Sequence, residues 1–123
     1  MKEILLIVGH GSRSKDAQET FNSVVDMVRE KSENEFFKVD GAHMELAHPS
    51  IEEKVKTLAA QGVNRILMVP YFLYEGIHIK EDIPELIEKL NEEYPKIEFR
   101  LGRPIGKEPL LAELLINRGK ELK

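Results

Sequence analysis

Residues 4–13 read Ile-Leu-Leu-Ile-Val-Gly-His-Gly-Ser-Arg, an apolar run that ends in a histidine between two glycines. Short apolar runs bounded by glycine are typical of buried strands in a parallel sheet. A second run, residues 66–69 (Ile-Leu-Met-Val), is followed by Pro70 and, after an aromatic stretch, by His78. Because ligands bind outside the carboxyl ends of parallel strands, we expect His10 and His78 at one edge of the sheet.

Four strand-then-helix units follow one another along the chain. Alternation of this kind predicts an α/β fold with right-handed crossovers and helices on both faces of the sheet. We therefore expect a single three-layer domain, residues 1–123, with a four-stranded parallel doubly wound sheet. The expected strands are residues 3–9, 36–46, 65–71 and 97–101, the last of them at the sheet edge because charged residues interrupt its apolar pattern.

Local signals place the helix starts. Ser50 and Glu53 have the spacing of a capping box ahead of an apolar run. Asp82 and Glu85 show the same spacing ahead of a third helix, and Pro109 suits the first turn of a fourth.

Composition narrows the class of protein. The chain has 123 residues, 41% of them hydrophobic and 33% charged, which fits one domain with a single core. No apolar stretch approaches the roughly 18 residues of a membrane span, and the N-terminal run is too short for a signal peptide. Cysteine is absent, so we expect a cytoplasmic protein whose transition-metal ligands are imidazole and carboxylate groups. A net charge of −4 argues against nucleic acid as a partner, and we expect no membrane contact.

The turn around His10 is the first candidate site. Its flanking glycines let the backbone turn sharply and leave the imidazole uncrowded, and Ser12 or Ser14 can cap the next helix. The turn lacks the third glycine of a dinucleotide fingerprint and the Gly-Lys-Ser/Thr of a phosphate-binding loop. Two interpretations stay open, a functional histidine or a glycine-rich turn with an incidental exposed one.

The second candidate is the aromatic and apolar loop of residues 72–78. One imidazole in such a loop suits a flat, hydrophobic ligand. In the alternative interpretation Phe72 and Ile77 are core residues and His78 is solvated.

The third candidate lies at the end of the second strand, where Glu45 would face the same crevice. A carboxylate there can complete a metal site or accept a proton, although a solvated Glu45 is the alternative. We expect His43 and His48 to be surface residues rather than ligands.

Four segments of the chain, taken together, resemble the class II tetrapyrrole chelatases, and in particular the short form of the sirohydrochlorin cobaltochelatase family. The segments are Val-Gly-His-Gly-Ser-Arg (residues 8–13), Glu-Leu-Ala-His-Pro-Ser (45–50), Phe-Leu-Tyr-Glu-Gly-Ile-His (72–78) and Asp-Ile-Pro (82–84). This family is related to the nickel and iron sirohydrochlorin chelatases. The resemblance spans nearly the whole chain and implies a chelatase-like domain.

The resemblance implies a lyase that inserts a divalent metal ion into sirohydrochlorin, with Co²⁺ in first place and Ni²⁺ or Fe²⁺ as alternatives. It implies no prosthetic group, and the lack of a nucleotide motif indicates that no ATP is needed. His10 would bind the metal and accept pyrrole protons, and His78 would be a second metal ligand. The residues that would contact the macrocycle are Glu45, Leu73, Tyr74, Glu75, Gly76, Ile77 and His78. The candidates for meeting its carboxylate rim are Arg13, Lys15, Lys80 and Arg103.

A tetrapyrrole is a broad plate, and one small domain offers limited surface to enclose it. We therefore expect a homodimer with isologous contacts, with His10 and His78 of both subunits facing a cleft in or near the interface.

A non-catalytic metal or tetrapyrrole carrier would use the same residues and stays open. A histidine phosphatase is disfavoured because Gly9 stands where that class has arginine. The metal and the pathway served (cobalamin, siroheme or F430) also stay open, since imidazole suits all three metals.

Overall fold

The computed structural model describes residues 1–74 and 76–123, except for the side chains of His78 and Ile79. Glu75, expected to contact the macrocycle, lies outside the described residues. The elements in chain order are β1 (Glu3–Gly9), α1 (Lys15–Ser32), β2 (Lys38–His43), α2 (Ile51–Ala60), β3 (Arg65–Pro70), a π-helical turn (His78–Asp82), α3 (Ile83–Glu93), β4 (Glu98–Leu101) and α4 (Pro109–Lys120).

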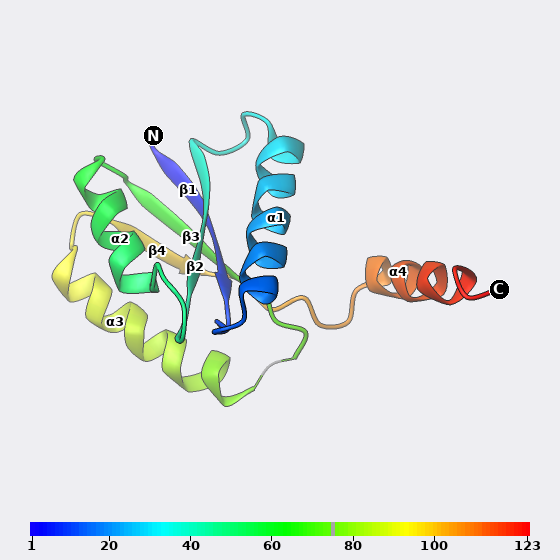
Figure 1. Ribbon diagram of the computed structural model, residues 1–123. Coiled ribbons are helices and arrows are strands. Elements are labelled where there is room, and N and C mark those ends of the chain that lie inside the picture. Colours follow the sequence, from blue (N-terminus) through cyan, green and yellow to red (C-terminus); the bar gives the residue numbers. More distant parts are fainter. Residues whose placement is uncertain (75) are drawn as a thin grey trace.

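The four strands form one sheet in the order β2-β1-β3-β4, and every strand pair is parallel. The predicted α/β fold with a four-stranded parallel sheet is therefore confirmed, as is the edge position of the last strand. Helix α1 covers one face of the sheet, and α2 and α3 cover the other (Figure 1). The strand order reverses between β1 and β3, which is the point where open α/β sheets bind ligands.

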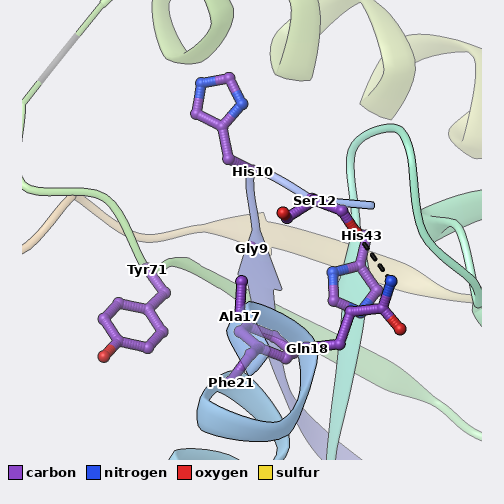
Figure 2. Close-up of a pocket in the computed structure, with 9 residues that line it drawn as sticks. Gly9, His10, Ser12, Ala17, Gln18, Phe21, His43 and Tyr71 are labelled. Atoms are coloured by element: carbon purple, nitrogen blue, oxygen red, sulfur yellow. Dashed lines mark hydrogen bonds between the residues drawn. The ribbon is translucent and has the colours of Figure 1, made fainter. Parts of the chain in front are cut away.

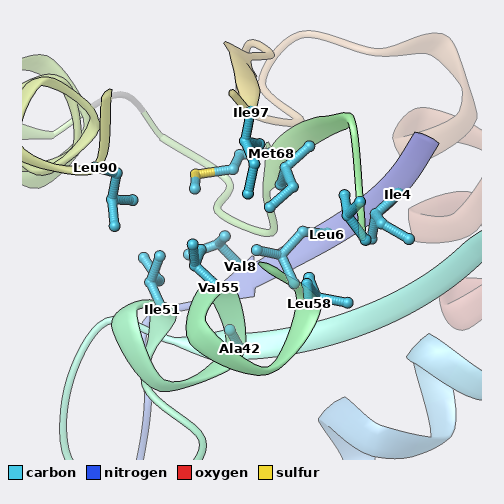
Figure 3. Close-up of a cluster of buried hydrophobic side chains, with 12 residues drawn as sticks. Ile4, Leu6, Val8, Ala42, Ile51, Val55, Leu58, Met68, Leu90 and Ile97 are labelled. Atoms are coloured by element: carbon cyan, nitrogen blue, oxygen red, sulfur yellow. The ribbon is translucent and has the colours of Figure 1, made fainter. Parts of the chain in front are cut away.

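The larger core lies between the sheet and helices α2 and α3 (Figure 3). Alternate residues of β1 and β3 point into it, and the helices contribute aliphatic side chains at helical spacing. Its buried members are Ile4, Leu6, Val8, Ala42, Ile51, Val55, Leu58, Val63, Ile66, Met68, Leu90 and Ile97.

On the opposite face, Phe21 of α1 packs where two strands carry no side chain. A Cβ atom added to Gly9 or to Gly41 would lie 2.7 Å from the Phe21 ring. The two glycines therefore let α1 approach β1 and β2 closely, with Val25 beside the ring. This packing sets the position of the first turn of α1 relative to the end of β1.

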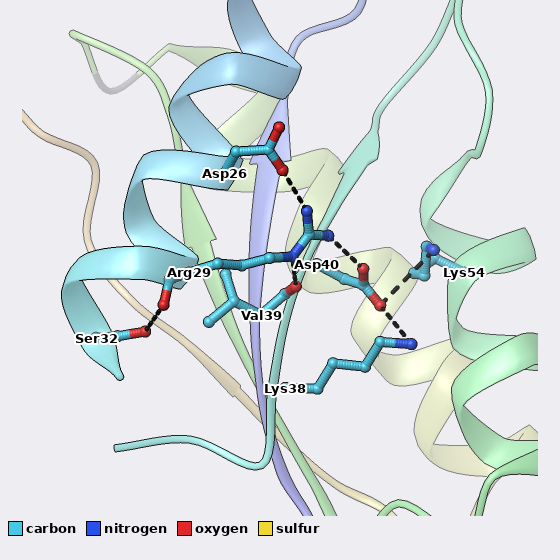
Figure 4. A network of polar contacts seen from close by, with 7 residues as sticks. All are labelled: Asp26, Arg29, Ser32, Lys38, Val39, Asp40 and Lys54. Carbon is cyan, nitrogen blue, oxygen red and sulfur yellow. Dashed lines mark hydrogen bonds and ion pairs between the residues drawn. The ribbon is translucent and has the colours of Figure 1, made fainter. Parts of the chain in front are cut away.

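A buried carboxylate joins α1, β2 and α2 (Figure 4). The Asp40 side chain, 7% exposed, pairs with Arg29 at 2.9 Å, with Lys38 at 3.4 Å and with Lys54 at 3.7 Å. Arg29 also donates its Nε–H to the Val39 carbonyl oxygen at 2.7 Å. Because three cations surround one buried anion, the cost of desolvating that carboxylate is offset.

The predicted capping box of α2 is confirmed. Ser50 Oγ accepts from the Glu53 backbone N–H at 3.1 Å, and Glu53 Oε1 accepts from the Ser50 backbone N–H at 2.8 Å. The Ser50 N–H and then His48 Nδ1, 2.7 Å from Oε1, lower the pKa of Glu53 to about 2.

The predicted start of α3 is confirmed. Asp82 is its N-cap residue and Pro84 lies in its first turn, although the Asp82 side chain makes no capping hydrogen bond to this helix. The second strand is shorter than expected and ends at His43, since residues 44–46 leave the sheet and Leu46 adopts a φ of 64°.

Helix α4 forms as expected from Pro109, but none of its residues is buried. It lies away from the sheet at the end of an extended linker (Figure 1). Leu110, Leu115 and Ile116 are 69%, 70% and 58% exposed. Among the described residues, no helix has the length and apolar character needed to cross a membrane.

The capping box predicts a pH-dependent stability. The folded-state pKa of Glu53 lies below the unfolded value of 4.5, so its stabilising effect is present above pH 4.5 and is lost as the pH falls towards 2. Glu53→Gln keeps an amide that can complete the box but removes the charge. Thermal denaturation from pH 7 to pH 2 should show the wild type more stable than Glu53→Gln at neutral pH, with the difference vanishing near pH 2.

Glu52→Gln is the matched control, because Glu52 is the other acid in the first turn of α2 but takes no part in the box. A constant difference between wild type and Glu53→Gln across this range would contradict the assigned role of the Glu53 charge.

Candidate functional site

The site begins where three strands end level with one another. In the sheet Val8 lies opposite Ala42 and Pro70, so the residues that follow these strands emerge at the same edge. The Tyr71 N–H extends the ladder by donating to the Val8 carbonyl oxygen at 2.8 Å. His10 is exposed at this edge.

His10 stacks on Phe72, the second residue after β3. Their ring centroids are 4.9 Å apart with an interplanar angle of 24°, and Phe72 is buried. The stack spans the point between β1 and β3 where the strand order reverses. It therefore holds an exposed imidazole on a buried aromatic support at the edge where ligands bind.

Gly11 brings the second-strand segment against the His10 turn. Its φ is 101°, and a Cβ atom there would lie 1.6 Å from the Glu45 carbonyl oxygen. The Glu45 N–H donates to the His10 carbonyl oxygen at 3.3 Å, and the Met44 N–H donates to that of Gly9 at 3.0 Å. The backbone of Glu45 is thus tied to that of His10, while the Glu45 side chain is exposed.

Two recesses flank His10. The first, called here the turn recess, has a volume of about 230 Å³ and lies beneath the glycine turn (Figure 2). The second, called here the loop recess, has a volume of about 360 Å³. The turn recess is lined by Gly9, His10, Gly11, Ser12, Ala17, Gln18, Phe21, His43 and Tyr71, and the loop recess by His10, Tyr71, Phe72, Leu73, Tyr74 and Gly76.

The loop recess gathers three of the expected macrocycle contacts, Leu73, Tyr74 and Gly76, around His10. Leu73 is 51% exposed and Tyr74 81% exposed, so the loop presents apolar and aromatic surface to a ligand. Ile77 is also exposed. A large exposed apolar patch of this kind marks a ligand or protein contact.

The loop is held in place by the linker to α4. The Ile105 N–H donates to the Phe72 carbonyl oxygen at 3.0 Å, and the Gly106 N–H donates to that of Leu73 at 3.1 Å. Residues more than thirty positions later in the chain therefore fix the start of this loop.

The second expected metal ligand falls in the π-helical turn, which begins at His78. Its side chain lies outside the described part of the structure, so its role as a ligand stays a prediction. Within the described residues, no group of three or more His, Asp or Glu side chains is placed to hold a metal ion. The four candidate cations for the carboxylate rim are exposed, namely Arg13, Lys15, Lys80 and Arg103.

The expectation that His43 is a surface residue is wrong. It is 5% exposed, and its ring packs on Phe21 with the centroids 4.7 Å apart. Burial lowers its pKa, because an imidazolium ion would lose solvation there. The sequence held a usable signal, because His43 directly follows the buried Ala42 at a strand end, as His10 follows β1.

Comparisons with known proteins identify relatives of this chain. The chain matches the model of the CbiX protein family over residues 4–122. The chain is 34% identical over 114 residues to the chloroplastic sirohydrochlorin ferrochelatase of Arabidopsis thaliana, a match that covers 93% of this chain and 50% of that relative. It is 31% identical over 137 residues to the sirohydrochlorin cobaltochelatase of Methanopyrus kandleri, covering 95% of this chain and 94% of that relative.

A solved structure is also similar. The sirohydrochlorin chelatase SirB from Bacillus subtilis subspecies spizizenii, in complex with cobalt, matches with a TM-score of 0.91 and 32% identity over 98% of this chain and 51% of that one. The chain thus spans about half the length of the Arabidopsis and Bacillus proteins and nearly all of the Methanopyrus protein.

The close approach at Gly11 predicts a steep cost for any side chain there. Gly11→Ala places a Cβ atom on the Glu45 carbonyl at a positive φ, so it should lower the free energy of unfolding by at least about 2 kcal/mol. Urea denaturation measures this. Gly76→Ala is the control, because its Cβ atom would meet no described atom within 4 Å, and it should change stability by less than about 0.5 kcal/mol. Equal effects of the two substitutions would contradict the tight approach.

Proposed function

Because the chain belongs to the CbiX family, we propose that it inserts a divalent metal ion into sirohydrochlorin, without ATP. The observation that carries the proposal is the exposed His10 imidazole, stacked on Phe72 beside an apolar loop recess. A flat tetrapyrrole lying on Leu73 and Tyr74 would bring its central nitrogens towards that imidazole. Relatives named as sirohydrochlorin cobaltochelatases and ferrochelatases support the same reaction.

In this mechanism His10 has two tasks. Insertion removes two protons from pyrrole nitrogens and replaces water on the metal with those nitrogens. A neutral imidazole can hold the incoming ion, and after the ion moves into the ring it can take up one of the two released protons, while the other passes to solvent. His78 would be the second ligand, and the exposed Glu45 carboxylate would contact the substrate beside His10.

We propose Co²⁺ as the metal substrate. The named relative that this chain covers over 94% of its length is a cobaltochelatase, whereas the named ferrochelatase is about twice as long. Ni²⁺ and Fe²⁺ are the alternatives, because imidazole ligands do not select among the three ions.

The absence of cysteine agrees with a cytoplasmic protein.

We also propose that two copies of this single chelatase domain form a homodimer. Helix α4 carries exposed Leu110, Leu115 and Ile116 and contacts nothing that buries them within its own described chain. Half-buried Leu67 and Val69 of β3 lie on the α1 face of the sheet, the face that holds fewer buried side chains. The partner's α4 would cover such a surface and bring a second site close to the first.

The metal-insertion proposal predicts a rate that depends on His10. Anaerobic sirohydrochlorin is mixed with Co²⁺, Ni²⁺ or Fe²⁺, and metallation is followed by absorbance against the non-enzymatic rate. Wild type should accelerate insertion with Co²⁺ ahead of the others, and His10→Ala should lower the enzymatic rate by about 100-fold or more.

His48→Ala is the matched control, because His48 is an exposed histidine that pairs with Glu53 away from both recesses, and its rate should equal that of wild type. If wild type binds the macrocycle but matches the blank with every metal, the protein is a carrier and the enzymatic proposal is wrong.

The dimer proposal predicts that association depends on α4. Wild type should sediment at twice the mass of the chain, and Leu110→Glu with Leu115→Glu should give monomers. Glu113→Gln, which changes a charged residue of the same helix, should stay dimeric. A monomeric wild type, or a dimer that survives both leucine substitutions, would contradict this interface.

A further inference from the structure

The turn recess is separate from the surface on which a macrocycle would lie. His10 contributes to both recesses and stands between them, and its ring points away from Gln18, Phe21 and His43 (Figure 2). A volume of about 230 Å³ is below the roughly 300–1,000 Å³ of pockets that enclose whole small molecules. The recess has the size of a short side arm rather than of a ring system.

His43 gives the turn recess an unsatisfied polar group. The side chain is 5% exposed, and its Nδ1 is buried with no hydrogen-bond partner among the described residues. Phe21 holds the ring at 4.7 Å and in turn stacks with Tyr71 at 6.0 Å, so the imidazole is fixed in an aromatic wall. A buried polar atom without a partner is costly, which indicates that something entering the recess completes it.

The surroundings favour an anion. Ala17 and Gln18 line the recess in the first turn of α1, where the helix amino end carries partial positive charge. Their backbone N–H groups already donate to Ser14 Oγ and to the Ser14 carbonyl oxygen, so the helix contributes its dipole and no free donor at these two residues. Gln18 is oriented by the hydrogen bond from its Nε2 to the Ser12 carbonyl oxygen at 2.7 Å. Among the described residues the lining contains no carboxylate, and Asp16, the acid of the first turn of α1, is exposed outside it.

We propose that the turn recess binds one carboxylate arm of the flat ligand that lies over His10, and that the Nδ1–H of His43 donates a hydrogen bond to it. This inference rests on the proposed function, because it assigns a contact for the carboxylate rim of that substrate. His43 is thereby a specificity-determining residue. It recognises where an arm is placed on the ring, while the loop recess recognises the ring itself.

The first experiment uses wild-type protein and simple probes. Sodium acetate and sodium propionate are titrated while the ring nitrogens of His43 are followed by NMR. Binding in the recess should shift the Nδ1 signal of His43 more than that of the exposed His48. No shift at His43 with either carboxylate would overturn the proposal.

The second experiment measures binding of metal-free sirohydrochlorin by absorbance titration. His43→Phe keeps an aromatic ring against Phe21 but removes the donor, and it should weaken binding about tenfold, as expected for one hydrogen bond to a charged group. His43→Asn places an amide near the position of Nδ1 and should keep most of the affinity, whereas His43→Gln places its amide further out and should not. Thermal denaturation of each variant shows that it is folded.

These outcomes separate the arm site from the metal-insertion proposal. If binding depends on His43 but no metal is inserted, the arm site stands and the enzymatic function falls. If wild type and His43→Phe insert metal with the same KM, the arm site is wrong and the enzymatic function stands. If acetate shifts His43 while His43→Phe binds the macrocycle like wild type, the recess takes free small carboxylates and the proposal of an arm site is wrong.

Discussion

The candidate site depends on one close approach of two backbone segments, the contact between Gly11 and the carbonyl of Glu45. No side chain fits in that gap, and two hydrogen bonds across it continue the pairing of β1 with the segment after β2. Without this approach the His10 turn would be an independent loop. With it, backbone hydrogen bonds tie the turn to the segment after β2, and an exposed imidazole acquires a fixed position over the end of β3. The role proposed for His10, which is to meet a metal ion and a ring nitrogen, would require precise placement of this kind.

The two faces of the sheet beneath the turn are packed in different ways. The face under α2 and α3 is filled by aliphatic side chains, whereas the face under α1 depends on a ring inserted over two glycines. Asp40 and its three cations then join α1 to β2 and α2 through charge. One aromatic contact and one ionic cluster thus hold α1 in position. Both involve side chains of α1, the helix whose first turn lines the turn recess.

The strands, their parallel arrangement and the helix that begins after Ser50 could be predicted, because hydrophobic runs and caps are local signals. The burial of His43 could not be read from its polarity, since it depends on Phe21 arriving from α1 over Gly41. The helix start at Asp82 could be predicted, but the π-helical turn before it could not, because residue spacing does not distinguish such a turn from an ordinary helix start. The exposure of α4 was equally hidden, since its leucine pattern is that of a packed helix and the sequence does not say against what it packs. That the segments after β2 and β3 lie near His10 could be predicted, because all three follow the ends of neighbouring strands. That the Phe72 ring supports His10 could not be predicted, because it depends on the register of β1 against β3.

The two hydrogen bonds from Ile105 and Gly106 to the loop after β3 have a wider consequence. They join the start of the loop after β3 to the root of α4, so neither segment can move away without breaking these two bonds. If α4 is where two copies meet, subunit association and ligand affinity are thermodynamically coupled, and the coupling acts equally in both directions. Dilution would then weaken ligand binding, and ligand would hold the assembly together. The seven-residue linker (residues 102–108) would in that way couple subunit association to ligand affinity.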